Sequence, residues 1–207
     1  MRILKKIFKS KKQADLELIS NPKVLFNNKI SVFEITLSRH KIGDSVNELR
    51  LDEVILTGLE TYPKKTEGRI WKDDKTFVLI NGKEIEFTLK ERIEAVINEG
   101  GWIGYKDGSR FRIKNEKITS FSLHLERLSP YSELSKKSII QKLGKRVKIK
   151  ETYEEFDGTL FHTDIMNFER LISITWDDWD KKILVISLGD LVKEKLDNTL
   201  SRVMQKE

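Results

Sequence analysis

The stretch that decides the fold class of this chain runs Val78-Leu79-Ile80-Asn81-Gly82-Lys83. A β-rich run meets an Asn-Gly pair, and a second, alternating run follows over residues 85–87. Asn-Gly between two such runs favours a two-residue hairpin turn, because both residues tolerate a positive φ. We therefore predict an antiparallel hairpin over residues 76–87.

A similar stretch lies 54 residues earlier and runs Val24-Leu25-Phe26-Asn27-Asn28-Lys29. Asn-Asn takes the place of Asn-Gly, and a further β-rich run over residues 30–33 follows it. This correspondence predicts another hairpin, over residues 23–35, and indicates that the chain contains duplicated units.

Capping signals and apolar periodicity predict two helices. Thr88 and Glu91 have the spacing of a capping box, and the apolar residues that follow fall on one helical face until a Gly-Gly pair. The other helix, over residues 135–143, is predicted to begin at Ser135 and to end at Gly144.

Each predicted helix leads into another alternating hairpin, over residues 110–123 and 171–188, and residues 50–72 are strand-rich. The sequence therefore predicts an α+β fold. We expect repeated hairpin-and-helix units that form antiparallel sheets with helices packed on one face.

The chain is predicted to divide into three regions. Residues 1–20 are a basic amphipathic tail, and residues 21–128 are an N-terminal hairpin/helix/hairpin region. Residues 129–207 are a C-terminal helix-plus-sheet unit with a terminal helix that begins at Asp190. The turn-rich run Ser129-Pro130-Tyr131-Ser132 is the expected linker between the last two regions.

The positive charge of the chain is concentrated in its first residues. Residues 1–12 carry six of the 39 basic residues and no acidic one, and the remainder carries 33 residues of each sign. A nucleic-acid partner is therefore not expected on the folded body. The tail residues expected to contact a partner, or weakly an anionic membrane, are Arg2, Ile3, Leu4, Lys5, Lys6, Ile7, Phe8 and Lys9.

The composition also predicts a cytoplasmic protein. No apolar run approaches the roughly 20 residues that span a bilayer, and the basic start leads into polar residues rather than the apolar core of a signal peptide. The absence of cysteine excludes a disulfide framework and a thiolate zinc site.

The sequence contains no recognisable catalytic motif. Neither Gly82-Lys83 nor Gly144-Lys145 has the remaining residues of a P-loop, and the serine-hydrolase elbow and the paired-histidine zinc motif are missing. We therefore expect no enzymatic activity, no catalytic residue and no cofactor.

One constellation leaves a metal-dependent hydrolase or nuclease open as an alternative. On a strand over residues 159–165, His162 and Asp164 would share a face. A solvated strand face is the simpler interpretation, so we assign no metal ligand, and we expect ordinary structural roles for the isolated His40 and His124. The donors of the alternative would be Asp157, His162, Asp164, Asp177, Asp178 and Asp180.

A basic run over residues 134–150 contains seven basic residues and no acidic one. Together with the tail it leaves open a second alternative, a peripheral membrane or nucleic-acid adaptor. Aromatic side chains that could stack on bases are missing from this run, and an acidic segment follows it directly.

An acidic turn with two tryptophans is the predicted site of partner binding. We expect Trp179, inside the turn, to be exposed, because tryptophan surrounded by charge is a common composition of interface hot spots. The residues assigned to this site are Trp176, Asp177, Asp178, Trp179 and Asp180.

Residues 135–145, Ser-Lys-Lys-Ser-Ile-Ile-Gln-Lys-Leu-Gly-Lys, resemble the helix of SmpA/BamE-like and β-lactamase-inhibitor-protein-like units. In those units a capped helix precedes a meander of strands. Arg146 replaces the usual proline, and the lipoprotein cysteine of the SmpA/BamE group is absent. The resemblance implies a scaffold that binds other proteins, and the layout is similar to that of small bacterial immunity proteins. We therefore expect a non-enzymatic cytoplasmic module, an immunity or inhibitor protein with one protein partner such as a toxin.

Overall fold

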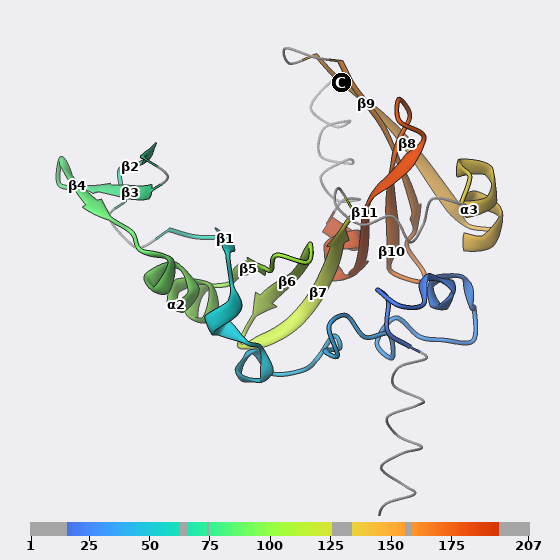
Figure 1. Ribbon diagram of the computed structural model, residues 1–207, viewed down its shortest axis with the longest axis horizontal. Helices are drawn as coiled ribbons and strands as arrows, with labels where there is room; N and C mark the ends of the chain where they lie inside the picture. Colours follow the sequence, from blue (N-terminus) through green and yellow to red (C-terminus); the bar gives the residue numbers. More distant parts are fainter. Residues whose placement is uncertain (1–15, 63–65, 74, 126–133, 156–158, 195–207) are drawn as a thin grey trace, which may run out of the picture.

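The computed structural model describes residues 16–62, 66–73, 75–125, 134–155 and 159–194. Its named strands form two antiparallel sheets (Figure 1). The spatial order in the eight-stranded sheet is β1 (Leu56–Leu59), β5 (Gly101–Gly104), β6 (Ser109–Lys114), β7 (Lys117–His124), β11 (Lys182–Gly189), β10 (Ile172–Asp177), β9 (Thr159–Asn167) and β8 (Val147–Glu155). The three-stranded sheet consists of β2 (Gly68–Lys72), β3 (Lys75–Ile80) and β4 (Lys83–Glu86). The predicted α+β class with antiparallel sheets is confirmed, and strands dominate it.

The predicted hairpin over residues 76–87 is confirmed as strands β3 and β4. Asn81 and Gly82 form its turn with φ angles of 51° and 71°, the conformation that a tight primed turn requires. The carboxylate of Glu67 accepts hydrogen bonds from the backbone N–H groups of both residues, at 3.0 and 3.1 Å. A side chain outside the turn thus reinforces what the Asn-Gly pair favours.

Both predicted helices are present, as α2 (Leu89–Glu99) and α3 (Lys136–Leu143). In α2 the hydroxyl of Thr88 accepts from the Glu91 N–H at 3.3 Å, and the Glu91 carboxylate accepts from the Thr88 N–H at 2.8 Å. In α3 the hydroxyl of Ser135 accepts from the Ser138 N–H at 3.2 Å. None of the helices that the structure describes is long and apolar enough to cross a membrane.

Each of these helices precedes an antiparallel meander. Helix α2 leads into β5, β6 and β7, and α3 leads into β8, β9, β10 and β11 (Figure 1). The last strands of the two meanders, β7 and β11, pair with each other, with Phe121 opposite Leu188. The predicted regions 21–128 and 129–207 therefore share one continuous sheet.

The predicted hairpin over residues 23–35 is wrong. Residues Pro22–Phe26 form a 3₁₀ helix, η1, with proline in its first turn. The adjacent residues Val24 and Leu25 are both buried, at 3% and 0% exposure. Neighbouring residues of a strand point to opposite faces, so a strand could not direct both into one core, whereas a helical turn can. The correspondence between this segment and residues 78–83 has no structural counterpart.

The hydrophobic core lies against one face of the eight-stranded sheet. The strand register aligns five side chains across β5, β6, β7, β11 and β10, and each is at most 1% exposed. These residues are Ile103, Phe111, Phe121, Leu188 and Ile172. Helices α2 and α3 and the segment before β1 add apolar side chains to the same cluster. The sheet is therefore the surface on which the rest of the chain packs.

The N-terminal tail is shorter than the predicted residues 1–20. Leu18 is fully buried, and its backbone N–H donates to the carbonyl of Thr36 at 2.8 Å, so residues 16–20 belong to the folded body. The tail residues expected to contact a membrane lie outside the described residues, as do the predicted linker and most of the terminal helix. Residues 190–194, where that helix begins, are helical.

Candidate functional site

The five residues predicted to bind a partner lie at the end of β10 and in the turn that follows it. As expected, Trp179 is exposed, with 80% of its surface open to solvent. Trp176, at the end of β10, is only 4% exposed and belongs to the hydrophobic core. Of the two tryptophans, only Trp179 can therefore contact a partner without unfolding of the turn.

Asp177 fixes the backbone of this turn. One oxygen of its carboxylate, Oδ1, accepts hydrogen bonds from the N–H groups of Trp179 and Asp180, at 2.8 and 3.1 Å. The next residue, Asp178, donates its own N–H to the carbonyl of Phe161 on β9 at 3.1 Å. The backbone of the turn is therefore held by hydrogen bonds within the turn and by one to the neighbouring strand β9.

Asp178 is buried beneath the turn rather than presented to solvent. Its carboxylate accepts hydrogen bonds from the Lys136 ammonium at 2.8 Å and from the Thr163 hydroxyl at 2.5 Å. The same ammonium also donates to the Thr163 hydroxyl at 2.7 Å. Asp178, Lys136 and Thr163 are thus each hydrogen-bonded to the other two. Burial raises the pKa of Asp178, but the hydrogen bonds from Lys136 and Thr163 outweigh it and leave the pKa below its ordinary value.

The acidic character of the turn is largely neutralised within the chain. Asp178 forms an ion pair with Lys136 at 2.8 Å, and Asp180 forms one with Lys182 at 2.6 Å. The expectation that all of these aspartates face a partner is therefore corrected. Trp176 and Asp178 are buried and are not available to a partner, whereas Trp179 is exposed.

The alternative metal site at His162 does not assemble in the part of the chain that the structure describes. His162 lies opposite Asp177 in the β9–β10 register. The carboxylate of Asp164, however, accepts a hydrogen bond from the Thr175 hydroxyl at 2.6 Å. The carboxylate of Asp178 is occupied by its ion pair with Lys136. Among the described residues, no group of metal-binding side chains includes His162, and Asp157 lies outside them.

The basic run over residues 134–150 is partly used inside the protein. Lys136 is paired with Asp178, and Arg146 forms an ion pair with Glu169. Two further lysines of the run lie over phenylalanine rings, at 5.5 and 5.6 Å from the ring centres. Lys136 and Arg146 are therefore paired with acidic residues of the same chain.

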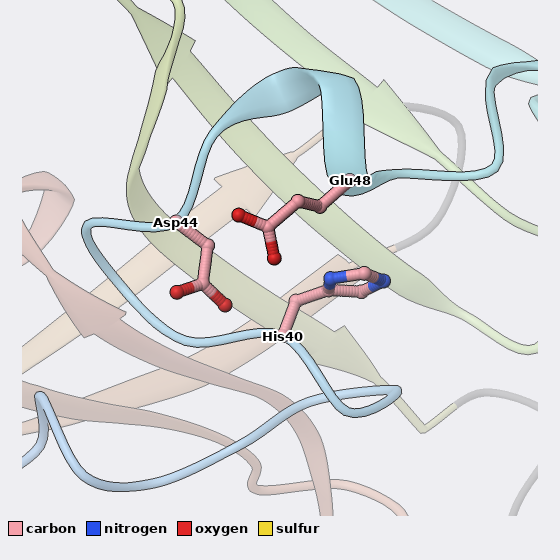
Figure 2. Close-up of side chains that lie close together, drawn as sticks. All are labelled: His40, Asp44 and Glu48. Atoms are coloured by element: carbon pink, nitrogen blue, oxygen red, sulfur yellow. The ribbon is translucent and has the colours of Figure 1, made fainter.

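A cluster that was not predicted lies in the loop before β1 (Figure 2). His40, Asp44 and Glu48 each direct one potential ligand atom into the same space, and these atoms all lie within 4.8 Å of one another. His40 and Asp44 are partly buried, and Glu48 is exposed. The expectation that His40 is isolated is therefore wrong. The only sequence signal is a regular spacing of four residues, and in a loop that spacing does not place side chains on one face.

The loop that carries this cluster is attached to the β6–β7 hairpin. The N–H of Gly43 donates to the carbonyl of Ile118 at 2.8 Å, and the Ile118 N–H donates back to the carbonyl of Asp44 at 3.0 Å. The N–H of Val46 donates to the carbonyl of Glu116 at 2.9 Å. These bonds fix the backbone between His40 and Glu48, which lies in the 3₁₀ helix η2 (Val46–Glu48).

The imidazole of His40 is fixed by packing. Its ring contacts the ring of Phe111 edge-on, with 5.8 Å between the centres. Burial lowers the pKa of His40 although Asp44 and Glu48 act in the opposite direction, so the neutral ring is favoured.

His40 also lines a cavity of about 410 Å³ together with Tyr105. Burial raises the pKa of Tyr105 to about 12, and its hydroxyl has no hydrogen-bond partner among the described residues.

Comparison with known proteins adds no relative to this picture. No protein-family model, no curated protein and no solved structure matches the chain.

Proposed function

We propose that this protein is a non-enzymatic binding protein that recognises another protein through the β10–β11 turn. The observation that carries the proposal is the 80% exposure of Trp179. An indole so exposed contributes little to folding, and tryptophan is enriched among the residues that dominate the affinity of protein interfaces. The exposure of Trp179 within a charged turn of fixed backbone is best explained by burial in a partner.

The fixed backbone of the turn supports this proposal. The hydrogen bonds to Asp177 and the buried Asp178 network hold the turn in one conformation in the free protein. Binding then costs little additional ordering of the backbone, which favours affinity. Asp180, Lys181 and Lys182 are exposed beside Trp179, so an apolar anchor is surrounded by a charged rim, as in typical interfaces.

The class of partner follows from the resemblance of residues 135–145 to inhibitor-type units. We propose a single protein partner, such as a toxin that this protein neutralises by binding, and a cytoplasmic location. The order of α3 followed by the meander of β8 to β11 agrees with that resemblance. The repetition of hairpin-and-helix units stays a prediction without the support of residues 24–29, and the weak contact of the tail with anionic membranes stays a prediction as well.

A photo-crosslinking experiment in the native cell tests the proposal. A photoreactive phenylalanine analogue replaces Trp179 in one variant and Trp71 in the control variant. Trp71 is also highly exposed, at 77%, but it lies on β2, on the opposite side of the molecule (Figure 1). We expect a crosslinked protein with the probe at residue 179 and none, or a different one, at residue 71. The same crosslinks from both positions, or none from residue 179, would contradict the proposal.

A further inference from the structure

We propose that His40, Asp44 and Glu48 bind a divalent transition-metal cation, with Zn²⁺ as the best fit. The three side chains supply one imidazole nitrogen and two carboxylates, whose charges together balance a doubly positive ion. Ca²⁺ and Mg²⁺ prefer all-oxygen sites, whereas imidazole with carboxylate is a donor set that zinc accepts. This site is independent of the Trp179 turn and of the proposed protein partner.

The two carboxylates of the cluster lack an ion pair within the described part of the chain. Neither Asp44 nor Glu48 forms an ion pair with a lysine or arginine among the described residues. Arg50, two residues after Glu48, is instead paired with Glu53 at 2.8 Å. Two adjacent carboxylates without a cation repel each other, so a bound cation would relieve an unfavourable interaction.

The ligand atoms need little rearrangement to reach one ion. Two donors that bind a tetrahedral zinc ion at about 2.0–2.2 Å lie about 3.3–3.6 Å apart. The three ligand atoms now lie within 4.8 Å of one another, so side-chain rotations on the order of 1 Å bring them to one ion, and the side chain of Glu48 is exposed. One oxygen of Asp44 accepts the Lys41 N–H at 2.8 Å, which orients this carboxylate and leaves its other oxygen for the ion.

The positions of the three residues are fixed before a metal arrives. The hydrogen bonds to the β6–β7 hairpin fix the loop backbone, and Phe111 fixes the ring of His40. Ser45 caps η2 by accepting the Asn47 N–H, so Glu48 lies on a defined turn. With three protein ligands the ion would keep a position for water, which is the arrangement of an open rather than a closed zinc site.

Calorimetric titration of the untagged protein with Zn²⁺ tests this proposal. We expect one ion per chain, and we expect the double variant Asp44→Asn/Glu48→Gln to bind at least about tenfold more weakly. Asparagine at residue 44 can still accept the Lys41 N–H, and the repulsion between the two carboxylates is removed, so the metal-free double variant should not melt below wild type. The control is Glu116→Gln, which removes a nearby exposed carboxylate in the β6–β7 turn and should leave zinc affinity unchanged.

A measurement on the unaltered protein keeps the proposal testable if a variant does not fold. The chain has three histidines, and the ring nitrogens of each can be followed by NMR during the addition of Zn²⁺. We expect stoichiometric Zn²⁺ to shift the ring nitrogens of His40 and to leave those of His124 and His162 in place. An unmoved His40, or wild-type zinc affinity in the double variant, would overturn the proposal.

Discussion

Replacement of Asp178 by asparagine tests whether a buried charge pair supports the turn beneath Trp179. Removing one partner of a fully buried ion pair typically costs about 3–5 kcal/mol, because the other charge stays buried without compensation. The side chain of Lys136 is 29% exposed, so its ammonium can turn partly toward water. Asparagine also keeps one acceptor for the Thr163 hydroxyl. We therefore expect a loss of about 1–2 kcal/mol in the free energy of unfolding.

The pH dependence of this loss has a definite sign. Hydrogen bonds from Lys136 and Thr163, against the effect of burial, keep the pKa of Asp178 below its ordinary value. The folded protein therefore binds this proton at lower pH than the unfolded chain does. The stabilisation is complete well above the unfolded pKa of about 3.9 and is lost as the pH falls through the folded-state pKa. The difference between wild type and Asp178→Asn should shrink in the same range.

Urea unfolding at pH 7 and at several values between pH 5 and pH 2.5 measures both effects. Lys136→Met and the double variant complete a cycle that isolates the coupling between the two residues. If Asp178→Asn is as stable as wild type at pH 7, or if the difference widens as the pH falls, the charge pair does not support the turn.

Two further predictions concern the sheet. At Gly101 (φ 151°) a Cβ atom would lie 2.2 Å from the carbonyl oxygen of Gly58, whereas at Gly82 (φ 71°) it would meet nothing within 4 Å. Gly101→Ala should therefore lower the free energy of unfolding by more than about 2 kcal/mol, and Gly82→Ala should lower it by about 1 kcal/mol, both measured with urea. Equal losses for the two variants would contradict the close packing of the strands at Gly101. Arg112 forms ion pairs with Glu60 and Glu194, so Arg112→Met should accelerate amide hydrogen exchange in residues 190–194. Unchanged exchange would show that these ion pairs do not attach the terminal helix to the sheet.

Features that depend on neighbouring residues were predictable from the sequence. Asn81-Gly82 specifies its hairpin, and Thr88 with Glu91 specifies the start of α2, because all the groups involved lie within a few residues. Val24 and Leu25 were mispredicted because their conformation depends on burial against the distant sheet. Propensity is a weak signal where tertiary packing decides.

The candidate site was predictable only in part, for the same reason. The exposure of Trp179 follows from its place inside a charged turn. The burial of Asp178 depends on Lys136, which is 42 residues away in the sequence. The convergence of His40, Asp44 and Glu48 depends on hydrogen bonds between their loop and the β6–β7 hairpin. No local pattern encodes either contact.

The most direct test of the central claim is the dissociation constant of the captured partner for Trp179→Ala, with Trp71→Ala as the control. We predict that Trp179→Ala weakens binding at least about tenfold, or about 1.4 kcal/mol, with little change in the free energy of unfolding, and that Trp71→Ala leaves affinity unchanged. Equal affinities for wild type and Trp179→Ala would contradict the claim that this turn is the binding surface.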